Sequence, residues 1–385
     1  MNTTTLTGLR IWDGEGIADA DAVRIEAGRI SAVGDASELS ADAQTISYQG
    51  ATAVPGLIDA HVHMVLDPER RTTPAPDEIP DMAAMRRRAA AMLAAGITTA
   101  RDLGGGHWRE LELREAINRG ETPGPRLLCA GQPVTSCAGH CHFWGGEAAD
   151  SNQINHVIDR QIDHGVDLIK VMATGGRMTS GSAPLKPQFS TAELQHVVAR
   201  ASDAGLDVAA HCHGTEGIHA AAQAGVATIE HCSWVGSEGW ASDYQQEIAE
   251  LIIERRVRVS PTVNAGWQRM IGNKTGERVT RALKDMIARG VTLVASTDAG
   301  IPGVYHHDLP RALAVFQQLT ETSAEFILRT ATSQSARALG LAETSGRITP
   351  GLSADLLIVE GDPSRDLEAL QRPVAVYYRG ELVSV

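Results

Sequence analysis

The sequence predicts an α/β fold, a (β/α)₈ TIM barrel with a small β-sandwich domain formed from both chain ends. Two observations indicate it. From about residue 54 to residue 344, apolar strand-like stretches alternate with amphipathic helical stretches, as in the βα units of a parallel sheet. Both ends consist instead of short β segments separated by turn residues. The 385 residues suffice for a barrel of about 250 residues and a smaller module.

Eight candidate strands are separated by seven helical stretches, with more helical sequence after the last strand. The strands are predicted at Gly56–Met64, Ile97–Leu103, Arg126–Val134, Val166–Ala173, Asp207–His213, Val226–His231, Val257–Val263 and Val291–Asp298. The helices are predicted at Asp81–Ala95, His107–Asn118, Asn152–His164, Thr191–Ala204, Glu216–Ala224, Ser242–Glu254 and Glu277–Arg289. Several helices end at a glycine just before the next strand, as in AAGIT and ARGVT, which is typical of helix C-termini.

The two β-rich ends are each too short to fold alone. We therefore expect residues 1–53 and 345–385 to pair as one composite β-sandwich domain, and residues 54–344 to form the barrel.

Composition limits which binding partners and which cellular location are expected. The formal net charge of −13 disfavours nucleic acid and anionic membrane surfaces, which need clustered cations. No run of 18 apolar residues predicts a membrane span, and the N-terminus shows no apolar signal-peptide core. The 5 cysteines form no CxxC pair, which indicates reduced thiols. We expect a cytoplasmic protein that forms a homo-oligomer.

Potential metal ligands follow several of the predicted strands. Reactive groups of a barrel belong at the C-terminal strand ends. His61 and His63 end the first strand two residues apart, so their side chains share a face, as a divalent metal requires. Three further strand ends carry His211, His231 and Asp298. The sequence therefore predicts a metal site at the barrel mouth.

Lys170 lies inside an apolar predicted strand. Burial there would lower the pKa of its amine, and a neutral amine can add CO₂ to become a carbamate. A carbamate is anionic and can bridge two metal ions. The alternative is a lysine that faces outward between helices or pairs with a carboxylate.

The loop that follows the third strand, Cys137–Gly146, combines glycines with His140, His142 and two aromatic residues. This combination indicates a substrate-contact loop, because glycine lets the backbone approach a ligand. A packed surface loop is the alternative. Further candidates for the rim of the site are His107, Arg177, His306 and His307.

The motifs PGLIDAHVHM, DLIKVMATGG, AAHCHGTEGI, TIEHCSW and STDAG together resemble the amidohydrolase superfamily. The most similar branch is the imidazolonepropionase-related group with prolidase-like and Xaa-Arg-type metallo-dipeptidases. The C-terminal GRITPGLSADLLIVEGDP is similar to the returning β-sandwich segment of that family. The resemblance covers nearly the whole chain, in the expected order. It is specific for the superfamily and only suggestive for the substrate.

The resemblance implies a hydrolase that cleaves a C–N bond, in a small-molecule amide or a dipeptide, with a hydroxide bridging two Zn²⁺ ions or other divalent metals. It implies that His61, His63 and Asp298 hold the more buried metal and that His211 and His231 hold the second. Lys170, as a CO₂-derived carbamate, would bridge the two.

The resemblance also implies the other roles. Asp298 would take a proton from the attacking water and deliver it to the leaving amine. His140 would act in catalysis by contacting the substrate, and His213 would either support the ligands from behind or face the substrate. His213 is given this role because the motif aligns His211 as the ligand. From their places in the loops after the third and fourth strands, His142 and Arg177 are further candidates for substrate binding.

The substrate and the metal count stay open. The stretch between Lys170 and His211 contains no tyrosine, whereas prolidase-like members carry one for the substrate carboxylate. Arg177 could replace it, but other amides, carbamates and cyclic amides remain alternatives. A mononuclear deaminase or imidazolonepropionase-like hydrolase is the first rival, because His213 and Glu216 have the HxxE spacing of such enzymes; Lys170 argues against it. A non-catalytic scaffold is the second, and the filled ligand positions argue against that.

Overall fold

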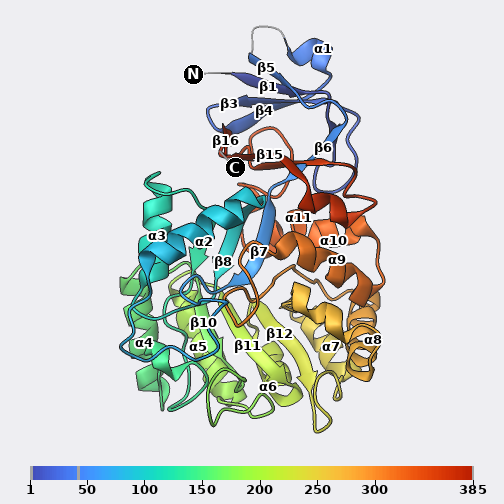
Figure 1. The fold of residues 1–385 in the computed structure, drawn as a ribbon. Helices are drawn as coiled ribbons and strands as arrows, with labels where there is room; N and C mark the ends of the chain where they lie inside the picture. Colours follow the sequence, from blue (N-terminus) through green and yellow to red (C-terminus); the bar gives the residue numbers. More distant parts are fainter. Residues whose placement is uncertain (1–2, 41–43, 384–385) are drawn as a thin grey trace.

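A computed structural model of the chain describes residues 3–40 and 44–383 (Figure 1). The parts of the predicted terminal domain at residues 1–2, 41–43 and 384–385 lie outside the described residues. Among the helices described, none is both long enough and apolar enough to cross a membrane.

The central strands form two runs of parallel pairs. The first run contains β7 (Leu57–Val62), β8 (Ile97–Asp102) and β9 (Arg126–Cys129). The second contains β10 (Ile169–Met172), β11 (Val208–Gly214), β12 (Thr228–Val235) and β13 (Arg258–Ser260).

Isolated parallel bridges link these runs to each other and to the segment that follows α8. The bridges join Val134 to Val171, Val259 to Leu293 and Val62 to Ala299. Parallel links therefore run from β7 through β13 and back to β7.

The predicted strand at Val291–Asp298 makes only isolated bridges rather than a regular ladder. Its backbone amides bond to different segments of the chain: Ala295 N donates to Thr330 O at 2.9 Å, and Asp298 N donates to His61 O at 2.9 Å. Asp298 also has a left-handed backbone, with φ at 62°, which ends any strand geometry there.

Helices alternate with the central strands, as the periodicity predicts. They are α2 (Met82–Ala94), α3 (Arg109–Asn118), α4 (Ser151–Asp163), α5 (Thr191–Asp203), α6 (Thr215–Ala224), α7 (Gln246–Glu254) and α8 (Lys274–Arg289). The chain then continues through α9 (Leu309–Thr320), α10 (Ala324–Thr330) and α11 (Ser333–Ala338). Their starts are set by local chemistry: in α5, the side chains of Ser190 and Glu193 form a capping box with each other's backbone amides.

Both chain ends contribute to the β-rich end of the molecule (Figure 1). One sheet has the order β4-β3-β1-β5, formed by Arg29–Gly34, Ala22–Glu26, Thr4–Thr7 and Gln44–Ser47. The other has the order β16-β15-β14-β6-β2, formed by Glu381–Leu382, Pro373–Tyr378, Leu356–Glu360, Ala51–Pro55 and Arg10–Ile11. Leu6, Val23, Ile358 and Tyr377 share one buried apolar cluster between segments far apart in sequence. The domain boundaries themselves stay a prediction.

The remaining helical segments are short. They are α1 (Ala36–Leu39) and the 3₁₀ helices η1 (His142–Trp144), η2 (Ala265–Met270) and η3 (Leu367–Gln371). The α/β class is confirmed, and the carboxyl ends of the parallel strands meet at one edge, where the predicted site residues lie.

Candidate metal centre

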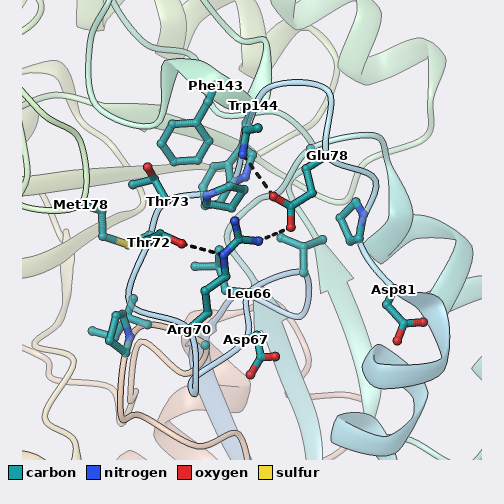
Figure 2. A pocket seen from close by; sticks show the side chains of 18 of the residues that line it. Leu66, Asp67, Arg70, Thr72, Thr73, Glu78, Asp81, Phe143, Trp144 and Met178 are labelled. Carbon is teal, nitrogen blue, oxygen red and sulfur yellow. Dashed lines mark hydrogen bonds and ion pairs between the residues drawn. The ribbon is translucent and has the colours of Figure 1, made fainter.

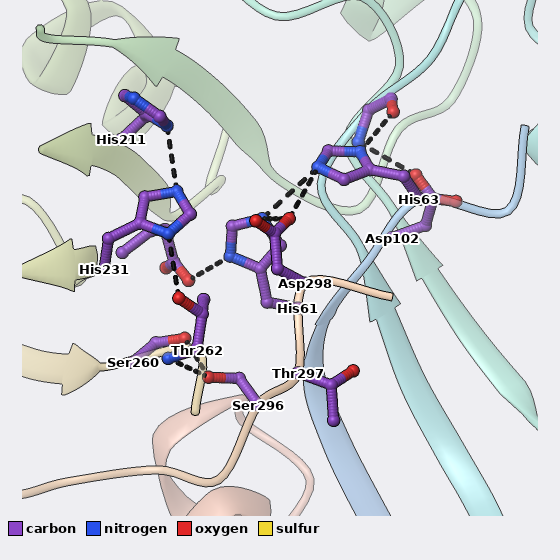
Figure 3. A network of polar contacts seen from close by, with 12 residues as sticks. His61, His63, Asp102, His211, His231, Ser260, Thr262, Ser296, Thr297 and Asp298 are labelled. Carbon is purple, nitrogen blue, oxygen red and sulfur yellow. Dashed lines mark hydrogen bonds and ion pairs between the residues drawn. The ribbon is translucent and has the colours of Figure 1, made fainter. Parts of the chain in front are cut away.

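Three potential ligands from two segments converge at the end of β7. The Nε2 atoms of His61 and His63 are 3.3 Å apart, and Asp298 Oδ1 lies 3.3 Å and 3.5 Å from them (Figure 3). Both histidines are buried, and one donor atom from each of the three residues lies within 4.8 Å of the others. The three side chains predicted to hold the first metal ion therefore lie close together.

A second cluster combines His211 and His213 of β11 with His231 of β12, again with donor atoms within 4.8 Å of one another. His211 Nδ1 and His231 Nε2 are 2.9 Å apart (Figure 3). The other nitrogen of His231 is bonded to Thr262 Oγ1, and His213 Nδ1 to Ser233 Oγ. The structure thus brings His213, predicted as a substrate contact, into the same group as the two predicted ligands.

Lys170 lies on the buried strand β10 and lines the cavity that contains both clusters. Its side chain is 1% exposed, and its Nζ atom has no hydrogen-bond partner among the described residues. Burial lowers the pKa of Lys170 to about 8, an effect that Glu230 and Asp298 oppose and Arg101 reinforces. The residue therefore faces the site rather than the space between helices.

A buried ion pair orients His61. His61 Nδ1 donates to Glu230 Oε2 at 2.9 Å, and Glu230 also accepts from Arg101 Nη2 at 2.8 Å. Burial would raise the pKa of Glu230, but Arg101 and His61 hold it well below its usual range. The bond leaves the Nε2 atom of His61 free to face the site. His63 is held in the same way, because its Nδ1 bonds Gly104 O at 2.8 Å.

Sequence reasoning missed Glu230, Arg101 and Asp59. Asp59 is buried, accepts from Thr297 Oγ1 at 2.6 Å and Thr297 N at 3.1 Å, and so fastens the Asp298 segment to β7. Burial raises the pKa of Asp59 to about 7. The signal was the one that identified Lys170, namely a charged residue inside an apolar strand.

Two ligand positions have strained backbones. Asp298 and His231 have φ angles of 62° and 64°, in the left-handed region that costs a non-glycine residue about 1–3 kcal/mol. Such conformations persist where surrounding contacts fix them, and they cluster at functional sites.

The protonation states of Asp298, His61 and His231 are those that bind a metal ion. Burial would raise the pKa of Asp298, but His61, His63 and Lys170 hold it well below its usual range. Burial lowers the pKa of His61 to about 4 and that of His231 well below the ordinary value. A carboxylate and neutral imidazoles are the forms that bind a metal.

The cavity of about 180 Å³ at the centre also contains His140 and Arg177. His140 is buried, its Nδ1 lies 3.1 Å from Thr179 Oγ1, and its ring is 4.7 Å from that of His211. The Arg177 guanidinium lies over the Trp240 ring, 5.0 Å from its centroid.

The other predicted rim residues do not line this cavity, although His107 lines a larger cavity beside it. His142 does not line this cavity; its Nδ1 bonds Gly139 O at 3.0 Å. His306 is buried behind the centre, with Nε2 3.1 Å from His63 O, while the Nε2 of His107 is 3.2 Å from Pro76 O. His307 packs near Tyr305, with ring centroids 5.8 Å apart.

Two larger cavities flank the centre, and Arg177 lines both. One, of about 580 Å³, lies under the segment 65–81 beside Phe143 and Trp144 (Figure 2). In it Arg70 pairs with Glu78 and donates to Thr72 Oγ1 at 2.9 Å. The other, of about 330 Å³, has walls that include three tryptophans and apolar side chains of α8.

Comparisons with known proteins identify the family of the chain. The model of the amidohydrolase family matches residues 52–383, so the chain belongs to that family. The chain is 27% identical over 360 residues to ochratoxinase of Aspergillus niger, covering 84% of this chain and 73% of that protein. It is 26% identical over 419 residues to an imidazolonepropionase of Chloroflexus aggregans, covering 96% and 92%.

A solved structure of a Xaa-Pro dipeptidase with methionine bound in its active site superposes with a TM-score of 0.88, at 25% identity and 100% coverage of both chains. The predicted superfamily and branch are confirmed. The chain is a hydrolytic enzyme of the amidohydrolase family.

Proposed function

We propose that this enzyme is a metal-dependent hydrolase that cleaves the C–N bond of a small amide with two divalent metal ions, zinc being the first candidate. The observation that carries the proposal is the pair of three-residue ligand clusters that share one cavity with an unpartnered, buried lysine. A prolidase-like dipeptide or another small amide is the proposed substrate, in line with the relatives. The proposed frame is a closed (β/α)₈ barrel over residues 54–344, with the sandwich domain at 1–53 and 345–385.

The residues present fit two metal ions. His61, His63 and Asp298 would hold one, and His211 and His231 the other. Lys170 as a carbamate would supply the bridging oxygens, which explains a buried amine that has no partner among the described residues. When bound, two such cations lower the pKa of a water molecule and polarise a carbonyl group.

Asp298 would handle the proton. Its carboxylate is ionised and faces the cavity, so an Oδ atom can accept a proton from the attacking water. The same group can then deliver the proton to the nitrogen of the leaving amine, which completes the hydrolysis without a second acid.

His140 and Arg177 would bind and orient the substrate. His140 contacts Thr179 through Nδ1. The side chains of His140 and Arg177 both line the cavity beside the ligand clusters. His213 would stay a substrate contact, although its position inside the second cluster also suits a ligand. Orientation of this kind supplies effective concentration rather than bond-making chemistry.

The mononuclear rival is less well supported. Glu216, which it needs beside the centre, is exposed in the first turn of α6 and does not line the cavity.

The test is amine release by the protein loaded with Zn²⁺ in bicarbonate buffer. The panel contains N-acyl amino acids, Xaa-Pro and Xaa-Arg dipeptides, aryl amides, carbamates and cyclic ureides. We expect hydrolysis of at least one amide that chelation abolishes and Zn²⁺ restores. The absence of turnover across the panel by protein with two bound metals would contradict the proposal.

A further inference from the structure

The apolar cavity of about 330 Å³ lies directly beside the metal centre. Its walls come from the end of β12, the segment after β13 including η2, one face of α8, and residues 301–304. The large apolar side chains that line it are Trp234, Trp240, Trp267, Met270, Leu283 and Met286.

Aromatic residues are concentrated here. The chain has only 6 tryptophans in 385 residues, and Trp234, Trp240 and Trp267 all line this cavity. Trp234 is fully buried, whereas Trp240 and Trp267 are half-buried and also line the metal cavity. Indole faces and edges attract other rings by 0.5–1.5 kcal/mol or so beyond the burial of area. The wall is therefore suited to a flat apolar group.

Helix α8 supplies the opposite wall. Val279, Leu283 and Met286 recur at helical spacing, so they share one face of the helix, and each is buried. Methionine adapts to irregular apolar surfaces and contacts aromatic rings favourably. An apolar cavity of about 150 Å³ is enough for a benzene molecule, so this one has room for a larger group.

The apolar cavity continues into the metal cavity. Trp240, Trp267 and Arg177 line both, as do His231 and Asn264. A group that occupies the apolar cavity can thus belong to a molecule whose carbonyl lies at the metal centre.

The larger cavity on the other flank also has apolar walls, among them Phe143, Trp144 and Met178, but it contains a cluster of four arginines, Arg70, Arg71, Arg87 and Arg88. The cavity beside α8 differs from it by its three tryptophans.

We infer that the apolar cavity binds an aromatic or similarly bulky apolar group of the substrate, next to the scissile amide. The inference rests on the proposed amide hydrolysis and names its substrate class. Trp240 and Trp267 are then specificity-determining residues, because they form the wall shared with the metal cavity.

The experiment compares matched amides with the Zn²⁺-loaded enzyme. N-acetyl-L-phenylalanine against N-acetyl-L-alanine places the ring on the amine side, and N-phenylacetylglycine against N-acetylglycine places it on the acyl side. In one of the pairs we expect the ring to raise kcat/KM by roughly 10-fold to 100-fold, the range that burial of such a group supplies.

Two variants test whether the preference for a ring arises in the apolar cavity. Val279→Phe fills the cavity from α8, and Trp267→Leu removes one wall shared with the metal cavity; both should reduce the ratio to about one-tenth or less of its wild-type value. Ile287→Phe is the matched control, since Ile287 is half-buried on the same helix and does not line the cavity. Circular dichroism and metal content establish that each variant is folded and loaded.

Calorimetric titration of the products provides a readout without turnover. Phenylalanine or phenylacetate should bind at least about 10-fold more tightly than alanine or acetate, and Val279→Phe should remove the difference. Ring binding without any hydrolysis would sustain the apolar site and contradict the proposed function. Hydrolysis with ratios near one in both pairs, or ratios that survive both variants, would overturn the inference.

Discussion

The metal centre and its rim are built by opposite means. The histidines of the candidate centre lie at or just after strand ends, are buried, and several are held through their second nitrogen by neighbours such as Glu230 and Thr262. The rim consists of loops and short 3₁₀ helices, and its side chains, such as Arg177 and Trp267, are partly exposed. Under the proposed function, the centre would supply the chemistry and the rim would select the substrate.

Lys170 is the exception within the centre, and its replacement tests the comparison most severely. Lys170→Ala should lose most of the bound metal and lower kcat by roughly 10³-fold or more, since the metals supply several kcal/mol of transition-state stabilisation. Added short carboxylates should restore part of both by supplying bridging oxygens. Metal analysis and amide kinetics measure the effect, with the exposed Lys186→Ala as control. Full metal content and full rate in Lys170→Ala would remove the bridge from the proposal.

Asp298→Asn separates proton transfer from ligation. We expect kcat to fall by roughly 10²-fold to 10⁴-fold with the fold intact, because a positioned acid–base group supplies that much. Metal content is measured on the same samples, since Asp298 also lies in the ligand cluster. An unchanged kcat at full metal occupancy would assign the proton to another group.

Glu230→Gln tests whether the contacts behind the ligands matter. The change weakens the acceptor of His61 Nδ1 and leaves Arg101 without its buried counter-charge. We expect metal affinity to fall by about 10–100-fold, as is usual for the partner of a ligating histidine, and thermal stability to fall as well. Competition with a chelating dye gives the affinity. Wild-type affinity would mean that the strand alone orients His61.

His140→Ala should act on the substrate and spare the metals. We expect kcat/KM to fall by roughly 10-fold or more for amides that bear a carboxylate and much less for neutral ones, since loss of one hydrogen bond to a charged group has about that cost. Kinetics with both substrate classes and a metal assay measure it. An equal loss on neutral substrates would contradict a carboxylate-binding role.

Glu110 gives the smallest expected effect, on stability alone. It is fully buried, and neither carboxylate oxygen has a hydrogen-bond partner in the described part of the chain. Burial and the charge of Asp102 raise the pKa of Glu110 to about 8 from 4.5. A raised pKa means that the folded state keeps the proton, so its contribution to stability is complete below about pH 4.5 and is lost as pH rises through 8.

Glu110→Gln should remove that loss. We expect its Tm to exceed that of the wild type at pH 9 and the difference to shrink toward pH 5, as followed by circular dichroism. The same difference at both pH values would show that the carboxylate is not the cause.

The comparison also explains what the sequence could predict. Periodicity located the central strands and helices, and the HxH spacing placed His61 and His63 on one face, because both signals are local. Glu230 escaped notice because its partner His61 is 169 positions away. The irregular segment before Asp298 escaped too, since its amides bond to three distant segments: Val294 N to Val259 O, Ala295 N to Thr330 O, and Thr297 N to Asp59 Oδ1.

The rim was harder to predict. His142 follows a left-handed Cys141, with φ at 56°, and this turn directs its ring away from the cavity that His140 lines. The apolar cavity needs η2, α8 and residues 301–304 to meet in space, and no local pattern encodes that meeting.

Anomalous X-ray diffraction at the zinc edge, on crystals of protein loaded in bicarbonate, tests the binuclear centre most directly. We expect two zinc peaks per chain, one at His61, His63 and Asp298 and one at His211 and His231, with density for a carbamate extending from Lys170 Nζ toward both. A single peak beside an unmodified lysine would contradict the binuclear centre and favour the mononuclear rival.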